Sequence, residues 1–588
     1  METFHEKYAK EEEQIFSLIE KNDSIVLFGH VFPDGDCYGS SEGLKYALKQ
    51  LYPDKKIYVS STDCAVAPYS FPRADVVSDE VIASSLHIIC DVADEHRVGD
   101  QRAVTVKGTG TIILDHHIKA GAFGDSEVID SSRGSCCDMI ADMLYGRVEH
   151  LNPVAASCFA LGIVSDTGRF LYVFYPRIYE IMKKLVEDGA DIASIYTQLY
   201  TVRESRLART AYYGGNYRAG ENGVNWIFLD KDDCRKFGIS GHSAALGVNN
   251  LSRIEASPLW AAFGEDEDGK VYGEFRSYGD KVNVQKIAKA FGGGGHFNAS
   301  GCILASKELI PEVIKACEDE ALNQFCGDYK EELKTLIDLA KKASEIIYGY
   351  YEKGFKVEIK SDQSPVTDAD KASDHLIRDT LKEKFPEYGI LTEEDKDDFV
   401  RLEKKRVFII DPLDGTSDFV AHDGQFAINL GLVEDHVPVV GVVAVPLTGE
   451  IYFAVKGQGS YYAEPGHVLK RNRVSSRLNR LKVLHSVKHV SQRALDLFDK
   501  HKDLIDSVIP MGAALKACTI ARGENDCAFT YGDGTKEWDT CAPQIIVLEA
   551  GGIYTDTKGN VMTYNRKDVY NHDGYAIVNR KENQWNLE

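Results

Sequence analysis

Three side chains with metal-binding chemistry follow an apolar segment near the start of the chain. The segment Ser24–Phe28 reads SIVLF, and the residues after it, GHVFPDGDCYGS, bring His30, Asp34 and Asp36 within seven residues. Pro, Asp and Gly are also the usual residues of turns, so a plain connection between two elements is the competing interpretation. Imidazole nitrogens and carboxylate oxygens are ligands for Mn²⁺ and Mg²⁺, so the stretch predicts a metal site if further ligands lie nearby.

The surrounding segments predict a doubly wound parallel sheet with helices on both faces. Strand-like apolar runs at Ser24–Phe28, Lys56–Ser60, Leu86–Cys90 and Thr111–Leu114 alternate with helical patterns such as Ser41–Leu51. Such alternation is typical of α/β folds. In these folds ligands bind at the carboxyl ends of the strands.

Acidic and imidazole side chains recur where four of these runs end. They are His30, Asp34 and Asp36 after the first run, Asp91 after LHIIC, Asp115, His116 and His117 at the end of TIILD, and Asp166 in GIVSD, which we interpret as a fourth strand end. One Asp at a strand end is usually a cap or a turn former. Four such ends with interleaved histidines favour one shared metal site.

The motifs around these residues resemble those of a known superfamily. HVFPDGDCYGS, CDVAD, LDHHI and GIVSDTGRF resemble the four motifs of the DHH phosphoesterases, in order and in spacing. Further on, GEFRSYGDKVNVQKIAKAFGGGGHFNASG resembles the DHH-associated substrate-binding domain of the nanoRNase/pAp phosphatase branch. A glycine-rich linker is the alternative for GGGG, but an apolar run resumes after HFNASG, which a linker does not predict.

The DHH resemblance assigns a role to each matching residue. It implies two ions, Mn²⁺ or Mg²⁺, with Asp91 as their shared ligand and Asp115 orienting an imidazole. The implied metal ligands are His30, Asp34, Asp36, Asp91, His116 and Asp166. The implied substrate contacts are His117, as the catalytic residue at the phosphate, and, in the second domain, Arg276, Ser277, Gly293, Gly294, Gly295 and His296.

A new amphipathic helix predicts a further domain from about Tyr329, because Leu336, Ile337 and Ala340 recur at helical spacing. Acidic stretches follow in KSDQSPVTDADKASD, ILTEEDK, VFIIDPLDGTSDF and EWDTCAPQIIVLEAGG. Charge runs such as TEEDKDD are usually exposed. In IIDPLDGT, however, an apolar strand brings Asp411 and Asp414 to a turn, and the following Gly-Thr predicts a helix start whose N–H groups can bind phosphate.

These stretches resemble the lithium-sensitive, Mg²⁺-dependent phosphatases related to inositol monophosphatase, which have a layered αβαβα fold. WDTCAP looks most like the 3'(2'),5'-bisphosphate nucleotidase branch, although Ala514 stands where many relatives carry a small polar residue. The resemblance implies two or three Mg²⁺ ions held by Glu393, Asp411, Asp414, Asp539 and the Leu413 carbonyl. It implies that Asp370 and Thr416, with Glu393, are catalytic, and that Gly415 and Lys516 bind phosphate.

Length, charge and cysteine usage narrow the classes of function. The length of 588 residues suggests two to four domains, and the resemblances imply three, at 1–205, 206–328 and 329–588. A net charge of −23 argues against binding long nucleic acid. No apolar run of 18 residues and no basic, apolar N-terminus appear, so we expect neither a membrane span nor a secretory signal. Thirteen cysteines without a CxxC pair suit a reducing cytoplasm.

Together the two resemblances predict a bifunctional metal-dependent phosphoesterase acting on small nucleotides, for which a homodimer is one allowed state. The N-terminal half would hydrolyse short oligoribonucleotides and pApA, and also pAp as many relatives do. The C-terminal half would convert 3'-phosphoadenosine 5'-phosphate to AMP. Three alternatives stay open: an inositol or sugar monophosphatase in the C-terminal half, a cyclic-dinucleotide phosphodiesterase in the N-terminal half, or one half as a regulatory nucleotide sensor. An inorganic pyrophosphatase of DHH type is disfavoured, because those enzymes carry basic residues in place of GGGGHFNASG.

Overall fold

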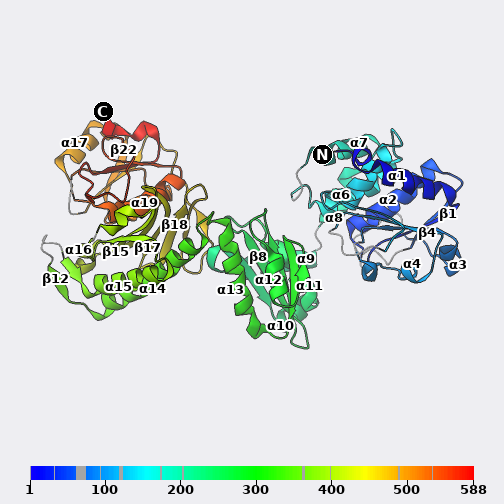
Figure 1. The fold of residues 1–588 in the computed structure, drawn as a ribbon, viewed down its shortest axis with the longest axis horizontal. Coiled ribbons are helices and arrows are strands. Elements are labelled where there is room, and N and C mark those ends of the chain that lie inside the picture. Colours follow the sequence, from blue (N-terminus) through cyan, green and yellow to red (C-terminus); the bar gives the residue numbers. More distant parts are fainter. Residues whose placement is uncertain are drawn as a thin grey trace. The chain divides into compact units, whose positions relative to one another are not determined.

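The computed structural model describes residues 2–31, 33–60, 74–92, 94–117, 123–171, 175–201, 204–359, 365–397, 399–487, 490–532 and 534–587. The chain forms two compact units, Met1–Arg203 and Glu204–Glu588 (Figure 1). Within these residues, none of the helices combines the length and apolar character that crossing a membrane requires.

The first unit is built on one parallel sheet in the order β2-β1-β3-β4-β5. Its strands are β1 (Ser24–Phe28), β2 (Lys56–Ser60), β3 (Leu86–Cys90), β4 (Gly110–Asp115) and β5 (Ser126–Ile129). Its helices are α1 (Phe4–Lys21), α2 (Gly35–Leu51), α3 (Asp79–Ala83), η1 (Glu95–Arg97), α4 (Arg102–Thr105), α5 (Cys136–Tyr145), α6 (Pro153–Asp166), α7 (Pro176–Glu187) and α8 (Ile192–Tyr200). The expected doubly wound sheet is therefore confirmed.

The central strand β1 of this sheet is largely apolar because both of its faces are covered. In β1, Ile25 and Leu27 pack into a core with α1, α2, α5 and α6, whereas Val26 and Phe28 pack into a second core with α3 and α4. A strand buried on both faces gains from an apolar residue at every position. This burial leaves the strand ends as the place where polar groups reach the surface.

Closely packed glycines bring two helices of the first unit together. Gly35 and Gly39 on α2 face α6, where an added Cβ would lie 2.5 Å from the Ser165 Cβ and 2.4 Å from the Cys158 carbonyl oxygen, respectively. Helix α2 begins at Gly35, earlier than the expected Ser41, since Asp34 caps it by accepting the Asp36 and Cys37 N–H groups at 3.0 Å. The first turn of α2 thus lies against the end of α6.

The second unit begins with a six-stranded mixed sheet in the order β10-β11-β9-β8-β7-β6, in which only the β7 and β8 pair is parallel. The strands are β6 (Arg218–Ala219), β7 (Val224–Leu229), β8 (Leu259–Glu265), β9 (Val271–Ser277), β10 (Gly294–Gly295) and β11 (Ala299–Leu304). The helices are α9 (Glu204–Asn216), η2 (Glu221–Gly223), α10 (Lys231–Phe237), α11 (Gly241–Ala245), η3 (Leu246–Leu251), α12 (Val284–Ala290), η4 (Lys307–Leu309), α13 (Ile310–Ala321) and η5 (Leu322–Gln324). Separate cores on the two faces, one with α12 and α13 and one with α9 to α11, make this a small α/β domain.

The rest of the second unit has the expected αβαβα layers. A seven-stranded sheet, β14 (Gly389–Thr392), β15 (Arg406–Asp414), β16 (Ala427–Glu434), β17 (Val437–Val445), β18 (Glu450–Val455), β19 (Gly459–Ala463) and β20 (Lys470–Arg471), follows the chain order. A five-stranded sheet has the order β22 (Ile505–Pro510), β21 (Leu481–His485), β23 (Cys527–Thr530), β25 (Tyr575–Val578) and β24 (Ile553–Thr555), and β12 (Val357–Ile359) pairs with β13 (Pro365–Thr367). The helices are α14 (Lys330–Lys353), α15 (Asp368–Lys384), η6 (Val400–Glu403), α16 (Thr416–Ala421), α17 (Gln492–Lys500), η7 (Lys502–Leu504), α18 (Leu515–Ala521), α19 (Glu537–Glu549), η8 (Lys581–Asn583) and η9 (Trp585–Leu587).

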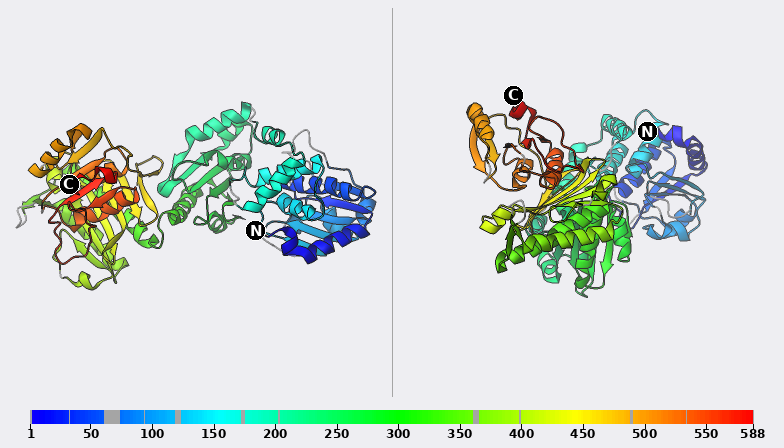
Figure 2. Two further views of the ribbon diagram at one scale, coloured as in Figure 1. Left: turned by 90° about the horizontal axis from the view of Figure 1, so that it is seen from above. Right: turned by 60° about the vertical axis from the view of Figure 1, so that its left-hand side comes forward.

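Four hydrophobic cores lie among these layers. Helices α14 and α15 cover one face of the seven-stranded sheet, as Figures 1 and 2 show, and α18 and α19 pack between the two sheets. Helix α17 packs on the outer face of the five-stranded sheet. Glycines again allow close contact, because an added Cβ at Gly431 on β16 would lie 2.6 Å from the Cys541 Sγ on α19. Helix α19 therefore lies directly on the strands that carry the acidic motifs.

The close α2–α6 contact leads to a stability prediction. Replacing Gly39 with Ala should destabilise the first unit by about 1–3 kcal/mol, because the new methyl group overlaps the Cys158 carbonyl. Hydrogen exchange of peptides from α2 and α6, with urea unfolding followed by circular dichroism, measures this effect.

Gly214→Ala is the matched control, since nothing lies within 4 Å of a Cβ at this exposed position in α9. It should be neutral or stabilising by up to about 1 kcal/mol, as for other helical glycines. Equal protection of α2 in wild type and Gly39→Ala would contradict the close-packing interpretation.

Candidate active sites

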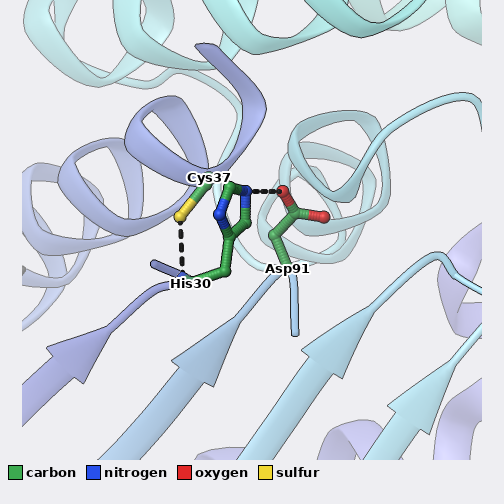
Figure 3. Close-up of side chains that lie close together, drawn as sticks. All are labelled: His30, Cys37 and Asp91. Atoms are coloured by element: carbon green, nitrogen blue, oxygen red, sulfur yellow. Dashed lines mark hydrogen bonds and ion pairs between the residues drawn. The ribbon is translucent and has the colours of Figure 1, made fainter. Parts of the chain in front are cut away.

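The first group of predicted ligands surrounds the His30 imidazole, just beyond β1. The Nδ1 atom lies 2.9 Å from the Val31 carbonyl oxygen, which orients the ring. The Nε2 atom then lies 3.7 Å from Asp34 Oδ1. It lies 3.6 Å from Asp91 Oδ2, the contact drawn in Figure 3. These distances leave room for an ion among one nitrogen and two carboxylates.

The second group surrounds His116, which follows β4. Its Nδ1 faces the Arg133 carbonyl oxygen at 3.4 Å. Its Nε2 faces three carboxylates, those of Asp36 at 3.6 Å, Asp91 at 3.5 Å and Asp166 at 3.2 Å. Asp166 is the last residue of α6, so its predicted place at a strand end is wrong. Because α6 packs against α2, the helix end reaches the same edge of the sheet.

Asp91 lies between the two groups. Its Oδ2 faces His30, and its Oδ1 faces His116 and His117. The residue follows β3 with a φ of 61°, an unusual backbone conformation for a side chain other than glycine. Its Oδ1 is buried and accepts no hydrogen bond from the described residues. A carboxylate in this position fits the shared ligand of two cations.

Backbone N–H groups hold the neighbouring carboxylate of Asp36. Its Oδ2 accepts from Cys136 N at 2.6 Å and its Oδ1 from Cys137 N at 2.9 Å, both at the start of α5. A helix N-terminus favours a carboxyl group as acceptor, so α5 fixes the orientation of this buried side chain.

His117 and Asp115 form a pair beside the two groups. Asp115 Oδ1 lies 2.8 Å from His117 Nδ1, and β4 extends to include Asp115. The ring is partly exposed, in contrast to the buried His30.

The titration behaviour of these groups reflects crowding of buried like charges. Burial, reinforced by Asp91 and Asp166, raises the pKa of Asp36 well above its ordinary value. Burial and nearby carboxylates also raise the pKa of Asp166 to about 7. For His116, burial lowers the pKa, but the facing carboxylates outweigh burial and raise it to about 9. The residues therefore fit divalent cations, which would offset this charge.

The predicted substrate-binding residues of the second domain lie on the β9 to β11 region. Arg276 is partly buried on β9, and its Nη1 donates to Glu274 Oε2 and to the Phe275 carbonyl, both at 2.8 Å. The Ser277 hydroxyl is buried and donates to the Val282 carbonyl at 2.7 Å, so its contacts lie within the domain.

The glycine run forms a tight hairpin between β10 and β11. A Cβ at Gly293 would lie 2.1 Å from the Gly301 carbonyl oxygen, and Gly295 has a φ of 136°. Gly294, by contrast, has open space at its Cβ position. His296 is exposed at the turn that follows, where its N–H donates to the Ala299 carbonyl at 2.7 Å.

Three carboxylates converge in the C-terminal site. Oxygen atoms of Asp411, Asp414 and Asp539 lie within 4.8 Å of one another. Asp411 and Asp414 belong to β15, with a register shift between them, rather than to a turn after the strand. Asp539 comes from the first turn of α19, and Glu393 follows β14. Burial, reinforced by Glu393, Asp414 and Asp539, raises the pKa of Asp411 well above its ordinary value.

A hydroxyl and a carboxylate lie together beside these acids. Thr416 Oγ1 is 2.9 Å from Asp370 Oδ1 and 3.1 Å from the Leu413 carbonyl oxygen. Asp370 is buried on the first turn of α15, and burial raises its pKa. Gly415, with a φ of 91°, allows the sharp change from β15 to α16, where a Cβ would lie 2.8 Å from the Gln425 carbonyl oxygen.

Lys516 is buried close to the acidic cluster. Its ammonium donates to the Met511 and Ala513 carbonyls at 3.2 and 3.0 Å, and its charge opposes the effect of burial on Asp414. The pKa of Asp414 still rises to about 6, chiefly through burial. Ala514 contributes its backbone, since its N–H donates to Asp414 Oδ2 at 2.7 Å.

Burial raises the pKa of Asp539 to about 8, and the charge of Asp414 adds to this effect. The nearby charges of Lys516 and Lys536 oppose these rises without cancelling them, so excess negative charge remains among the carboxylates of this site. The donor set of oxygens fits Mg²⁺.

Three residues of these sites were missed by the motif analysis. Cys37 is buried beside His30 and Asp91, with ligand atoms of all three within 4.8 Å of one another. Asn429, opposite Asp411 on β16, donates to Asp414 at 3.0 Å, and its own Oδ1 is buried without a hydrogen bond from the described residues. Arg133 is buried and pairs with Asp138 and Asp142 behind His116. The available signal for Cys37 was its position directly after Asp36 in the first motif, whereas Arg133 and Asn429 depend on contacts with residues distant in sequence.

Comparison with known proteins separates the chain into two parts. Family models match the DHH family, N-terminal domain, at residues 24–163, the DHHA1 domain at 232–323 and the inositol monophosphatase family at 328–587. The bifunctional oligoribonuclease and PAP phosphatase NrnA of Bacillus subtilis is 32% identical over 312 residues, which are 52% of this chain and 97% of the relative. The 3'(2'),5'-bisphosphate nucleotidase CysQ of Aggregatibacter actinomycetemcomitans is 30% identical over 258 residues, which are 43% of this chain and 94% of the relative. An exopolyphosphatase-related protein of Bacteroides fragilis, known from a crystal structure, is 26% identical, with a TM-score of 0.48, 55% of this chain covered and 97% of that chain.

The chain is thus a fusion of two phosphoesterase modules. It belongs to the DHH family, with a DHHA1 domain, in its N-terminal half and to the inositol monophosphatase family in its C-terminal half. Both families are metal-dependent.

The raised pKa values predict an unusual pH dependence of stability without metal. Folding raises the pKa of Asp166 from near 3.8 to about 7, that of Asp539 to about 8 and that of His116 from near 6.5 to about 9. Each group binds its proton more tightly in the folded chain, so its contribution to stability is lost as pH rises through this range. With chelator present, the urea concentration at the unfolding midpoint should decrease as the pH is raised from about 5 to about 8.

Divalent ions should reverse this trend, because they bind the deprotonated carboxylates and displace protons. Calorimetry in buffers of different ionisation enthalpy should detect proton release on addition of Mn²⁺ or Mg²⁺. The same pH profile with and without ions would show that the acidic clusters do not bind them.

Proposed function

We propose that the chain is a bifunctional phosphoesterase with one metal centre in each half. The observation that carries the proposal is the position of Asp91 between the His30 and His116 groups. The C-terminal site likewise brings several carboxylates together, those of the three converging aspartates. Bound divalent ions would lower the pKa of a water molecule and offset charge on the phosphoryl group.

The N-terminal half is proposed to hydrolyse short oligoribonucleotides, pApA and pAp. In this proposal His30, Asp34 and Asp91 hold one of two Mn²⁺ or Mg²⁺ ions, and Asp91 is shared with the second. The other ligands of the second ion are Asp36, His116 and Asp166. Support comes from the distances above and from NrnA, whose name describes an oligoribonuclease and PAP phosphatase.

His117 is proposed to contact the substrate phosphate. The proposal is supported by its position beside both groups of ligands, where Asp115 Oδ1 lies 2.8 Å and Asp91 Oδ1 lies 3.4 Å from its Nδ1. In the second domain, Arg276, His296 and the backbone of Gly293 to Gly295 are proposed to bind the nucleotide, whereas the buried Ser277 would support the hairpin.

The C-terminal half is proposed to convert 3'-phosphoadenosine 5'-phosphate to AMP with two or three Mg²⁺ ions. Their proposed ligands are Glu393, Asp411, Asp414, Asp539 and the Leu413 carbonyl. The Thr416 hydroxyl lies between Asp370 and the Leu413 carbonyl, so Asp370 can accept a proton that Thr416 receives from water. Gly415 and Lys516 are proposed to bind phosphate. The name of CysQ, a 3'(2'),5'-bisphosphate nucleotidase, supports the nucleotide as substrate.

The organisation of the chain is part of the same proposal. We place the domain boundaries at 1–205, 206–328 and 329–588. The first boundary lies beside the division between the two compact units at Arg203 and Glu204, and the second lies near the family matches that end at 323 and begin at 328. The twelve cysteines within the described residues are buried free thiols, which supports a reducing cytoplasm as the site of action. A homodimer is part of this proposal, and the molar mass of the full-length chain measured by light scattering tests it.

An inositol or sugar phosphate is the second candidate substrate of the C-terminal half. Family membership supports it, because the matched model is that of inositol monophosphatase. A single substrate comparison separates the two candidates.

Single substitutions should separate the two activities. His116→Ala should lower the rate of pApA hydrolysis at least 100-fold, because it removes a proposed metal ligand that faces three carboxylates. It should leave phosphomonoesterase activity of the C-terminal half intact. Asp539→Asn should lower the phosphomonoesterase activity of the C-terminal half and leave pApA hydrolysis intact. Rates on pApA and on a phosphomonoester at saturating metal provide the measurement.

Exposed residues provide the controls, namely His150→Ala for the first site and Asp506→Asn for the second. Full pApA cleavage by the His116→Ala chain would refute the N-terminal site.

Substrate preference of the C-terminal half should be measured in the His116→Ala chain, where the other site is silent. We expect 3'-phosphoadenosine 5'-phosphate to be hydrolysed faster than inositol 1-phosphate, with inhibition by Li⁺, which supplies half the charge of Mg²⁺. Lys516→Ala should reduce this preference roughly tenfold, because it removes a buried cation next to Asp414.

Lys558→Ala, an exposed lysine paired with Asp573, is the control. If inositol 1-phosphate is hydrolysed faster than 3'-phosphoadenosine 5'-phosphate, the nucleotidase assignment is wrong but the assignment as a phosphatase stands. No hydrolysis of either compound with Mg²⁺ would reject both.

A further inference from the structure

A buried cysteine lies inside the N-terminal cluster of ligands. Cys37 is in the first turn of α2, one residue after Asp36, and its side chain is fully buried. Figure 3 shows its sulfur beside His30, with the imidazole between the sulfur and the Asp91 carboxylate in this view. The ligand atoms of His30, Cys37 and Asp91 nevertheless lie within 4.8 Å of one another, a spacing that one ion can bridge.

The backbone leaves space for this sulfur. A Cβ at Gly29 would lie only 2.3 Å from Cys37 Sγ, so any side chain at position 29 would displace it. The sulfur also accepts the His30 N–H at 3.1 Å. The thiol is therefore held next to the residue whose imidazole faces Asp91.

A second observation points to a ligand at this position. Asp91 is buried with a φ of 61°, and its Oδ2 faces the His30 imidazole at 3.6 Å. Its other oxygen, Oδ1, faces His116 and His117 and has no hydrogen bond from the described residues. A strained and incompletely satisfied carboxylate next to an imidazole and a thiol is a donor set with nitrogen, oxygen and sulfur. Sulfur donors favour Zn²⁺, Cd²⁺ and Co²⁺, whereas Mg²⁺ prefers oxygen.

We propose that Cys37 is a sulfur ligand at the His30 side of the N-terminal metal centre and makes this centre select thiophilic divalent ions over Mg²⁺. The inference rests on the metal centre proposed above and adds its selectivity. On binding, the thiol releases its proton to solvent and a metal–sulfur bond forms, with no change of oxidation state.

A purely structural role is the alternative, since the sulfur also accepts an N–H group. Serine separates the two roles, because its hydroxyl oxygen can accept the same N–H but is a poor ligand for soft ions. Alanine removes both roles. Cys158→Ala is the matched control, because Cys158 is another buried cysteine of the same unit. Among the described residues it belongs to none of the groups of side chains that could hold a metal ion.

The test adds Co²⁺ alone to the metal-free full-length chain and records the absorption spectrum. We expect a thiolate-to-cobalt charge-transfer band in wild type and Cys158→Ala that is absent in Cys37→Ser and Cys37→Ala. Competition should show Cd²⁺ binding weakened about tenfold or more by Cys37→Ser, with Mg²⁺ binding changed less.

Persistence of the band in Cys37→Ser would overturn the proposal. It would also be overturned if wild type shows cobalt bound, with ligand-field bands that Asp91→Asn removes, but no charge-transfer band. That second result needs no folded Cys37 variant and leaves the proposed phosphoesterase centre in place. Cobalt binding unaffected by Asp91→Asn would instead reject the centre itself, and the inference with it.

Discussion

Clustered carboxylates removed from water are the constraint on which both halves of this chain depend. A buried carboxylate is costly unless a positive charge or several hydrogen-bond donors lie beside it. Asp36 and Asp411 are both fully buried and have further carboxylates as neighbours, so each raises the electrostatic cost of the others. The two folds are unrelated in sheet topology, yet each places such a cluster where a strand ends beside a helix N-terminus.

The two halves offset this charge by different means. In the N-terminal centre, His116 faces three of the carboxylates, and the start of α5 donates two N–H groups to Asp36. In the C-terminal centre the nearby positive charges are Lys516, whose ammonium is also engaged by two carbonyls, and Lys536, whose charge opposes the rise in the pKa of Asp539. Protonated imidazoles can partly replace a metal ion, whereas a lysine held by carbonyls cannot approach all the acids. It follows that the C-terminal centre depends more strongly on bound cations for its charge balance.

Sequence motifs predicted the parts of the structure that are local. The residues at the ends of β1, β3 and β4 were found because a short apolar run followed by Asp or His is visible in the chain itself, and the expected sheet and layers are confirmed. Asp166 was placed on a strand because GIVSD is apolar, but a run of four to five residues does not distinguish a buried helix from a strand. Arg133 and Asn429 act through contacts with residues far away in sequence, so no local pattern indicates them.

Packing at residues 322–326 affects how the two halves can be studied. Leu322, Phe325 and Cys326 precede the predicted boundary at 328, yet they belong to the same hydrophobic core as α14 and the seven-stranded sheet, and the ring of Phe325 lies 4.7 Å from that of Tyr461. A cut at the boundary would remove these side chains from the phosphatase core, and loss of large buried side chains costs several kcal/mol. Failure of a truncated phosphatase would therefore report on folding as well as on catalysis. Point variants in the full chain avoid this ambiguity, because they silence one centre while leaving the shared core intact.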